Sequence, residues 1–448
     1  MTATSDAPIG KWRLDRAVAK RALLWLIFLA PFFYLTYGAA NWLAAQRVHV
    51  PNITFHWEHG IPFVAWTIFP YWSINAFYGL SLFLNDIAIE VDRLAKRYLT
   101  AQVVAVSCFI AFSLTFIFPR PSTSGASGFL FEILGGFDKP FNQAPSLHIA
   151  LLVIIWAHWR SRLGGAMLLV WNIWCLLIGI SVLTTYQHHF IDIPTGALLG
   201  FFALWLFPAG APSPLSGYRL KHDATSRRIG GYYAAASLAL FLIVVLQTRS
   251  SALFLFLLWP ALALGIVSLG YLGAGAKVFE KRADGTISFA SRWLLAPYRL
   301  VAIVNSHLWT RQLAPSVLVF DGVHLGRLPK HSELSAFATV IDLTGELAKP
   351  SHVEIAWQCF PSLDLVPVSP DDLEKASDAI ETGRSRGPVL VCCALGFQRS
   401  AAAVGTWLLR QGHAATAAQA IALLKTTGRP IHLREDMIVA GETGARHG

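Results

Sequence analysis

Long apolar stretches constrain the fold of this chain more than any other feature of its sequence. The chain has 448 residues, of which 54% are hydrophobic and only 14% are charged. Soluble proteins seldom have such a composition, and about 20 consecutive apolar residues suffice for a helix to cross a bilayer. The stretches that we expect to span a membrane are residues 22–45, 61–85, 98–118, 146–159, 165–184, 190–208, 231–248 and 252–275. The first half of the chain is therefore predicted to be a multi-span α-helical membrane domain.

The basic residues indicate how this domain is oriented. The larger basic clusters, including those at residues 93–97 and 277–282, fall on one predicted side of the bilayer. The opposite side carries only four basic residues, which are Arg47, Arg120, Lys139 and Arg249. Lysine and arginine concentrate on the cytoplasmic side of membrane proteins, so both termini, including the polar tail 1–21, are predicted to be cytoplasmic. The net charge of +10 is explained by this orientation and does not indicate a nucleic-acid partner.

Residues 315–448 have the pattern of a globular α/β domain. Short apolar runs predict strands, and longer periodic segments predict helices. The predicted strands are 317–320, 340–343, 354–360 and 389–392, and the predicted helices are 371–382, 398–411 and 417–426. The five cysteines are few and odd in number, which argues against a disulfide framework and fits a reducing compartment for the three C-terminal ones, Cys359, Cys392 and Cys393.

Residues 276–314 join the apolar part of the chain to this α/β part. Apolar residues alternate there with Arg292, Arg299 and Arg311. The pattern fits an amphipathic helix that lies on the membrane surface. It fits equally an ordinary soluble helix that packs on the next domain.

The segment from Val389 to Gly412 contains the residues that point most directly to chemistry. An apolar strand ends in Cys393, five residues follow, and Arg399 and Ser400 open a helical pattern. A loop between a strand and a helix N-terminus directs backbone N–H groups at one point and favours an anion there. The planar guanidinium of Arg399 can bind two phosphate oxygens, and a cysteine in such a positive field readily becomes a nucleophilic thiolate. The segment is therefore predicted to bind a phosphomonoester and attack its phosphorus, whereas the alternative is a buried cysteine pair at a strand end.

This Cys-x5-Arg-Ser segment resembles the active-site loop of cysteine-dependent phosphatases of the dual-specificity class. The resemblance implies that Cys393 is the nucleophile, that Arg399 holds the phosphate, and that the Ser400 hydroxyl helps the thiolate to leave. It also implies that Gly396 lies in the substrate-binding loop. The sequence departs from the family at one position, since Cys392 precedes the nucleophile where the family usually has histidine.

Such a phosphatase needs an acid to protonate the departing alkoxide. The family places an aspartate on a loop some thirty residues before the cysteine, and Asp364 has that spacing here. Asp371 and Asp372 are competing candidates. Arg429 either lines the pocket or ends a helix at the surface. The absence of lysine between Cys393 and Arg399 argues against multiply phosphorylated inositol lipids.

Polar residues also gather at one predicted face of the membrane domain. They occur in three separate segments, at residues 119–121, 144–148 and 187–192. Polar groups at membrane depth are costly and usually functional. His188 and Asp192 are four residues apart, so on a helix they would share one face, and the carboxylate would orient the imidazole. The alternatives are a structural polar network or a metal site.

These three segments resemble the type 2 phosphatidic acid phosphatase (PAP2) superfamily, over residues 22–208. The resemblance implies that His188 attacks phosphorus through a phosphohistidine, with Asp192 as its orienting partner. It implies that His148 is the general acid and that Arg120 and Ser146 contact the substrate. The implied chemistry needs neither a metal nor another cofactor.

Two cations of this family are missing here, and another histidine competes for the nucleophilic role. Ser113 and Val182 stand where the family has lysine and arginine. A weaker grip on a dianion favours a phosphodiester substrate, so the resemblance is closest to the inositolphosphotransferase-like branch. His189 is an alternative nucleophile, with poorer spacing to Asp192.

Together these features predict a PAP2-like six-helix core, two additional spans in residues 209–275, and a dual-specificity-type α/β domain. We expect a bifunctional membrane enzyme that acts on a phospholipid or lipid phosphate, and on phosphomonoesters in the cytoplasm. Its expected location is a bacterial inner membrane, whereas the oligomeric state is open. The alternative is a membrane-anchored signalling protein that binds phosphorylated partners at degenerate sites, and a transporter is a further alternative.

Overall fold

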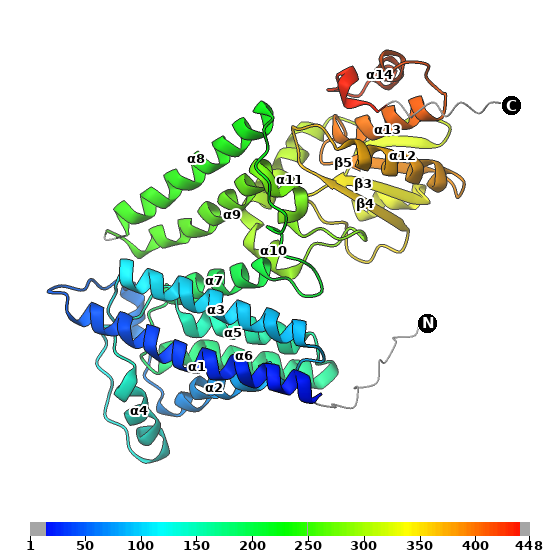
Figure 1. Cartoon of the computed structure of the whole chain (residues 1–448). Coiled ribbons are helices and arrows are strands. Elements are labelled where there is room, and N and C mark those ends of the chain that lie inside the picture. Colours follow the sequence, from blue (N-terminus) through cyan, green and yellow to red (C-terminus); the bar gives the residue numbers. More distant parts are fainter. Residues whose placement is uncertain (1–14, 249, 440–448) are drawn as a thin grey trace. The chain divides into compact units, whose positions relative to one another are not determined.

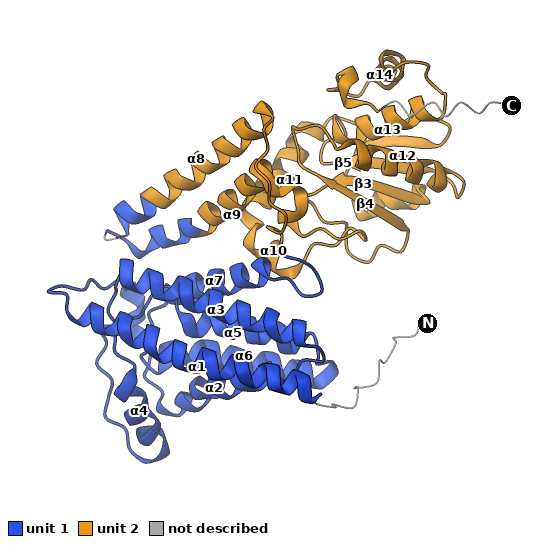
Figure 2. Cartoon of the chain, viewed as in Figure 1, with its two compact units in different colours: residues 1–213, 243–258 blue, residues 214–242, 259–448 orange. Residues whose placement is uncertain are grey.

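The computed structural model describes residues 15–248 and 250–439. It is mostly helical and contains one small sheet (Figure 1). The chain forms two compact units, shown in Figure 2. Unit 1 comprises residues 1–213 and 243–258, and unit 2 comprises residues 214–242 and 259–448. Each unit is described by itself.

Unit 1 is a helical bundle. Its helices are α1 (Arg16–Ala45), α2 (Ile68–Phe83), α3 (Ala88–Ala111), α4 (Gly125–Phe137), α5 (Leu147–Arg160), α6 (Gly165–Thr184) and α7 (Asp192–Leu206). Glycines on α7 allow α5 and α7 to pack closely. A Cβ atom added at Gly196 would lie 2.4 Å from the carbonyl oxygen of Ser146, and one added at Gly200 would lie 2.7 Å from Val153 Cβ. This close packing brings the start of α5 next to the start of α7, where the polar segments meet.

Among the described residues, five helices are long and apolar enough to cross a membrane, judged by length and composition. They are Arg16–Ala45, Ala88–Ala111, Gly165–Thr184, Ala224–Gln247 and Ala252–Phe279. The stretches predicted at 61–85, 146–159 and 190–208 contain the shorter helices α2, α5 and α7. The prediction at 98–118 was misplaced, because α3 begins at Ala88 and ends at Ala111. The charged first turns of α3 hid its start, since Glu90 and Arg93 pair with each other there.

Unit 2 begins with apolar helices and continues into the α/β part. Its first helices are α8 (Ala224–Gln247, of which residues 224–242 belong to this unit), α9 (Leu258–Leu269), α10 (Phe289–Leu294) and α11 (Ala296–Thr310). The rings of Tyr233 and Tyr271 stack with centroids 5.5 Å apart, and Tyr233 also meets Tyr298 of α11 edge-on at 5.8 Å. An aromatic cluster thus joins these helices to one another.

The sheet of unit 2 has five strands in the order β1-β2-β5-β3-β4. They are β1 (Ser316–Phe320), β2 (Val323–Arg327), β3 (Thr339–Thr344), β4 (Ala356–Ser362) and β5 (Val389–Cys393). All neighbours are parallel except β1 and β2. Every residue of the central strand β5 is buried, as expected of a parallel strand covered on both faces. The loops after the carboxyl ends of such strands are where α/β proteins bind ligands, and Cys393 stands at the end of β5.

Three helices follow the sheet, α12 (Pro370–Arg384), α13 (Arg399–Arg410) and α14 (Ala417–Thr426). The four predicted strands and three predicted helices of this part are confirmed within about two residues at each end. Sequence reasoning missed β2, because its sequence Val-His-Leu-Gly-Arg lacks a clean apolar alternation.

Lys281 was misjudged as one of the cations that set membrane orientation. Its side chain is fully buried, with Nζ 2.5 Å from a carboxylate oxygen of Asp342 and 2.6 Å from the Thr344 hydroxyl. A buried charge is tolerated only when it is paired, and β3 supplies the partners. The first residues of the predicted linker are thus part of the α/β core.

Candidate active sites

The turn between β5 and α13 places the thiol of Cys393 inside a ring of donors. The sulfur accepts a hydrogen bond from the Gly396 backbone N–H at 3.2 Å and another from the Ser400 hydroxyl at 3.3 Å. Gly396 has φ +80°, and a Cβ atom there would lie 2.6 Å from the Gly326 carbonyl, so only glycine fits without strain. The three predicted residues Cys393, Gly396 and Ser400 are therefore brought together around one sulfur atom.

Three consecutive carbonyl groups of this loop are held away from the sulfur. Ser306 of α11 donates to the Ala394 carbonyl at 2.6 Å, and Arg429 donates to the carbonyls of Leu395 at 2.7 Å and Gly396 at 3.2 Å. The C=O and N–H groups of a trans peptide point in opposite directions. The N–H groups that follow these three carbonyls must therefore turn inward, which makes the loop an anion-binding nest.

Arg429 was named from the sequence with two alternative roles, whereas Ser306 was not anticipated. Arg429 is buried, which rules out the alternative of a surface helix terminator, and its side chain also bonds the Ala314 carbonyl at 2.8 Å. Burial lowers the pKa of Arg429 from its ordinary value, although the neighbouring thiol acts in the opposite direction. Ser306 lies 88 residues before its partner, so no local pattern could have indicated it.

Arg399 is fully buried and bonded to an acidic partner that sequence reasoning missed. Its two terminal nitrogens donate to the Glu346 carboxylate at 2.9 and 2.7 Å, and one of them also bonds the Ser362 carbonyl at 3.0 Å. Burial alone would raise the pKa of Glu346, but the charge and hydrogen bonds of Arg399 outweigh it and hold that pKa below its usual value. The Arg399 Nε atom is buried and has no hydrogen-bond partner within the part of the chain that the structure describes. It is the donor that an incoming phosphate oxygen can still use.

Asp364 lies on the loop after β4, beside this arginine. A carboxylate oxygen of Asp364 is 3.3 Å from an Arg399 nitrogen, and 31% of the side chain is exposed. Its competitors have other surroundings, since Asp371 and Asp372 lie in the first turn of α12, where Asp372 bonds the Ser369 hydroxyl at 2.7 Å. Of the three candidates, Asp364 is the one placed next to the loop residues. Its own carbonyl accepts from the Tyr271 hydroxyl at 3.0 Å.

Cys392, the residue before Cys393, faces the other side of β5. It is fully buried among Leu334, Phe337, Val340 and Leu390. Burial raises its pKa well above the usual value for a thiol, and the Asp342 carboxylate adds to the effect. Cys392 is therefore an inert core residue, distinct from the thiol of Cys393.

Unit 1 holds a second polar centre. The Nδ1 atom of His188 is 3.1 Å from Asp192 Oδ2, and its Nε2 atom is 3.0 Å from the Ser146 hydroxyl. The predicted residues Ser146, His188 and Asp192 are therefore brought together. The expected helical basis of this pairing was wrong, because α7 begins at Asp192 and His188 lies in the turn before it.

His189 points to a different set of partners. Its Nδ1 atom is 3.1 Å from Glu58 Oε2, and its ring stacks on Phe116 with centroids 4.5 Å apart. His189 contacts Asp192 through its backbone: its N–H donates to the Asp192 carboxylate at 3.0 Å, and its carbonyl accepts from the Asp192 N–H at 3.1 Å. The alternative nucleophile is thus engaged by Glu58, a residue that lies 131 positions away and that sequence reasoning missed.

His148 and Arg120 occupy two other positions near this centre. The ring of His148 stacks on Tyr71 at 4.2 Å, and its buried Nε2 atom has no hydrogen-bond partner among the described residues. Arg120 donates to the carbonyls of Thr185 at 3.3 Å and Tyr186 at 3.5 Å, and its guanidinium lies over the Phe131 ring. Arg120 is therefore held beside the segment that carries His188.

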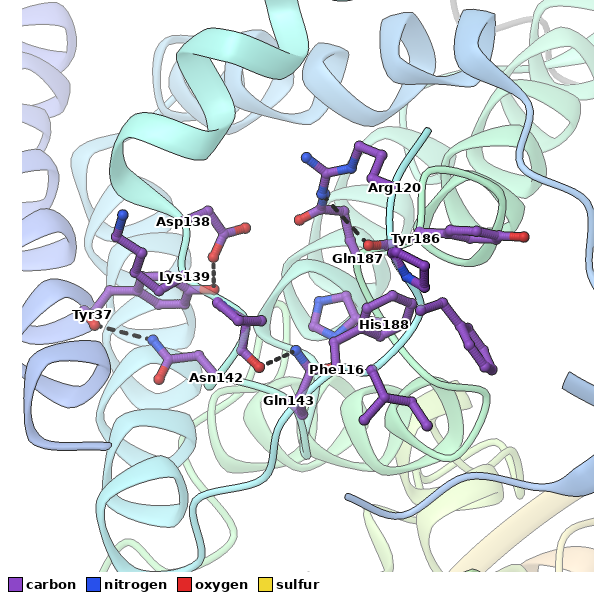
Figure 3. Close-up of a pocket in the computed structure, with 14 residues that line it drawn as sticks. Tyr37, Phe116, Arg120, Asp138, Lys139, Asn142, Gln143, Tyr186, Gln187 and His188 are labelled. Carbon is purple, nitrogen blue, oxygen red and sulfur yellow. Dashed lines mark hydrogen bonds between the residues drawn. The ribbon is translucent and has the colours of Figure 1, made fainter. Parts of the chain in front are cut away.

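A cavity of about 360 Å³ opens beside His188, and Figure 3 shows the residues that line it. Arg120 and His188 lie on one side of this view, and Asp138, Lys139 and Asn142 lie on the other. Ser146 and His148 are not among its lining residues. Lys139 adds a second cation, which the sequence analysis had counted only toward membrane orientation. The cavity thus combines a possible nucleophile with cations that suit an anionic ligand.

Neither centre resembles a metal site by composition. Across residues 15–248 and 250–439, no group of three or more His, Cys, Asp or Glu side chains could hold a metal ion. The side chains of His188, Asp192 and Ser146 make polar contacts among themselves and with backbone N–H groups.

Comparison with known proteins gives a limited result. No family model and no curated protein matches this sequence. Among solved structures, human DUSP28 is similar to 29% of this chain over 86% of its own length, with 21% identity and a TM-score of 0.24. Tk-PTP in its active form is similar to 28% of this chain over 93% of its own length, with 20% identity and a TM-score of 0.25. PTPMT1 in complex with PI(5)P is similar to 28% of this chain over 90% of its own length, with 18% identity and a TM-score of 0.25. At these TM-scores the likeness decides nothing about activity, which has to be argued from the geometry of the two centres.

Proposed function

We propose that this chain is a membrane-bound phosphatase with two separate covalent phosphoenzyme sites. The observation that carries the proposal is the loop around Cys393, where a thiol accepts two hydrogen bonds at the end of a buried strand. Three outward carbonyls turn the intervening N–H groups toward that thiol. Such a loop stabilises both a thiolate and the phosphoryl group that the thiolate would attack.

In the proposed reaction the Cys393 thiolate attacks the phosphorus of a phosphomonoester. The phosphorus–oxygen ester bond breaks as the sulfur–phosphorus bond forms, and Asp364 gives its proton to the leaving alkoxide. Water then attacks the phosphocysteine and gives a proton to Asp364, which releases phosphate. The Ser400 hydroxyl, 3.3 Å from the sulfur, stabilises the thiolate as it leaves. Arg399 binds the transferring group through Nε, while Glu346 fixes the other end of its guanidinium.

The second proposed site is centred on His188. Asp192 holds Nδ1, so the Nε2 atom is the nucleophile, and it becomes available when Ser146 gives up its hydrogen bond. Attack of Nε2 on a lipid phosphate or phospholipid head group forms a phosphohistidine as the phosphorus–oxygen bond to the leaving group breaks, and His148 gives the departing oxygen its proton. Arg120 and Lys139 bind the phosphate in the cavity. Water or an alcohol then takes the phosphoryl group from His188, giving hydrolysis or transfer.

The membrane is part of this proposal. The helices listed above are long and apolar enough for bilayer spans, and residues 276–312 contain further exposed apolar side chains. We place the chain in a bacterial inner membrane with both termini in the cytoplasm, following the distribution of its basic residues. The substrate at Cys393 is then a phospholipid monoester or a phosphorylated protein side chain.

Trapping the two phosphoenzymes tests the proposal. Full-length protein in lipid vesicles is incubated with phosphorus-labelled phosphatidic acid and quenched. We expect an acid-labile label that disappears in His188→Ala, and an acid-stable label that disappears in Cys393→Ser. The absence of both labels from the wild-type chain would overturn the proposal.

One observation favours the alternative of a phospho-binding signalling protein at the cysteine site. Both terminal nitrogens of Arg399 are bound to Glu346, which leaves fewer donors for a transition state. In that case labelled phosphopeptide or lipid phosphate would bind the wild-type chain without release of inorganic phosphate.

A further inference from the structure

Helix α11 has its polar and apolar faces the wrong way round for a helix in water. The polar residues Ser306 and Thr310 are 8% and 4% exposed, whereas Val301 and Trp309 are 67% and 66% exposed. Leu300, Val304 and Leu308 are also exposed, so the outward face of the helix is mostly apolar, with Asn305 and His307 as its exposed polar residues. A helix with this arrangement needs an apolar medium around it.

The surroundings of α11 within unit 2 identify that medium as lipid. Trp259 of α9 donates to the carbonyls of Trp293 at 3.0 Å and Leu294 at 3.2 Å, which joins α10 to a helix counted among the candidate membrane spans. Arg292 and Arg311, at the two ends of this segment, are exposed. Cations beside an apolar helix face suit the anionic head groups of a bilayer surface.

The inward face of the same helix reaches the catalytic loop. Ser306 donates to the carbonyl of Ala394, the residue directly after the proposed nucleophile, at 2.6 Å. Arg299, about two turns earlier on the helix, donates to the Glu346 carbonyl at 3.0 Å, and the Glu346 carboxylate in turn binds Arg399. Helix α11 therefore exposes apolar side chains on one face, and with its other face it contacts two parts of the cysteine site.

We propose that α11 lies in the surface of an anionic bilayer, and that the hydrogen bond of Ser306 makes the conformation of the Cys393 loop depend on this membrane contact. The inference rests on the proposed phosphatase function of that loop. Ser306 is a positioning residue, since it fixes the peptide between Ala394 and Leu395 so that the Leu395 N–H turns toward the bound phosphate. When α11 is seated in lipid, the loop is held in its active geometry. When α11 leaves the bilayer, the clamp is lost and turnover falls.

This arrangement makes lipid phosphates the favoured substrates. When α11 lies in the bilayer surface, Cys393 is held close to the lipid head groups. A lipid phosphomonoester has a high local concentration there. A soluble aryl phosphate reacts at the same site but gains nothing from that proximity.

The position of α11 is tested without any activity measurement. A bimane fluorophore is attached at Val301→Cys in the full chain, reconstituted in vesicles that contain an anionic lipid, and the labelled parent chain gives the background from native cysteines. We expect quenching by brominated lipid and protection from aqueous iodide. The control Ser385→Cys, at an exposed position at the end of α12, should show the reverse. Protection from both quenchers would mean that a second copy or another protein covers α11, and quenching by iodide alone would mean water; either result overturns the proposal.

The coupling is tested by turnover of an aryl phosphate in the same vesicles. Ser306→Ala should lower kcat about tenfold through a displaced loop, and Ser306→Thr should restore it. Thr310→Val is the matched control, because it removes a buried hydroxyl whose hydrogen bond goes to the Ser306 backbone carbonyl in the same helix. Val301→Asp should also lower kcat in the wild-type background. It should not lower kcat further in the Ser306→Ala background, because both substitutions interrupt the same link between the bilayer and the Cys393 loop.

The outcomes separate this inference from the proposed function. If the wild-type chain does not turn over the aryl phosphate, the proposed function fails and the quenching result still decides whether α11 contacts lipid. If the wild type is active and Ser306→Ala equals it in kcat, or the effects of Ser306→Ala and Val301→Asp simply add, the coupling is refuted while the phosphatase function stands.

Discussion

The two candidate sites differ in how their residues come together. Around Cys393, the nucleophile, the turn glycine, the arginine and the hydroxyl all come from one segment of eight residues, 393–400. The centre at His188 draws on loops and helix starts spread over residues 120–192. The first site is therefore fixed largely by local backbone geometry, whereas the second depends on the packing of a whole helical bundle.

The arginines of the two sites show the same contrast. Arg399 is fully buried and bonded to a carboxylate, a carbonyl and the neighbouring Asp364. Arg120 is held by two backbone carbonyls at 3.3 and 3.5 Å and lines an open cavity. We infer that the cysteine site is preorganised for one phosphoryl geometry, and that the cavity beside His188 adapts to a larger head group.

Abolishing one activity while measuring the other is the strongest test of whether the two sites act independently. Cys393→Ser should lower aryl phosphate turnover by about a thousandfold or more, since the covalent intermediate is lost. The same variant should leave phosphohistidine formation at His188 unchanged. Cys392→Ala is the control, because that buried thiol does not face the loop. If Cys393→Ser also abolished the phosphohistidine, the two sites would not be independent.

The buried pair of Arg399 and Glu346 gives the next largest effect. Glu346→Gln removes the closest countercharge of a buried guanidinium and leaves it only the partly exposed Asp364, which should destabilise unit 2 by roughly 3–5 kcal/mol. Because the pKa of Glu346 is lowered in the folded state, its contribution is complete above the unfolded value near 4.5 and is lost as the pH falls through the folded pKa. The difference in Tm between wild type and variant should therefore shrink below about pH 4.5. A difference that stays constant down to pH 2 would refute the charged pair.

The turn glycine tests whether the cysteine site depends on local backbone geometry. Gly396→Ala places a Cβ atom within 2.6 Å of the Gly326 carbonyl at a φ of +80°, so the loop must move. We expect kcat on aryl phosphate to fall by about a hundredfold, because displacements near 1 Å have costs of this size. Gly412→Ala is matched, since Gly412 also has positive φ (+75°) but open space around it. It should lower stability by about 1 kcal/mol and leave kcat unchanged.

The same contrast explains what the sequence could and could not predict. The strand, turn and helix around Cys393 were predictable, because apolar periodicity and the Cys-to-Arg spacing are local signals. The partners that hold this loop, Ser306, Glu346 and Arg429, come from distant segments, so spacing alone did not identify their contacts. At the other site the spacing of His188 and Asp192 suggested their contact, but the turn that produces it was read as helix.

Substitutions in the cavity beside His188 should have the smallest effects, and these effects should appear in substrate binding rather than in kcat. Lys139→Gln removes one of two lining cations, and its side chain is exposed, so we expect KM for a lipid phosphate to rise about tenfold at most while kcat changes little. Arg120→Gln, at a better buried position, should have the larger effect of the two. Lys330, an exposed lysine of unit 2 outside the cavity, provides the matched control Lys330→Gln, which should leave KM unchanged. Initial rates against lipid phosphate in mixed micelles measure all three variants.

An adaptable cavity predicts that a second lining cation partly compensates for the loss of the first, so the double variant should lose more than the sum of the single changes in free energy. Simple additivity would instead mean that this cavity is as rigid as the loop around Cys393.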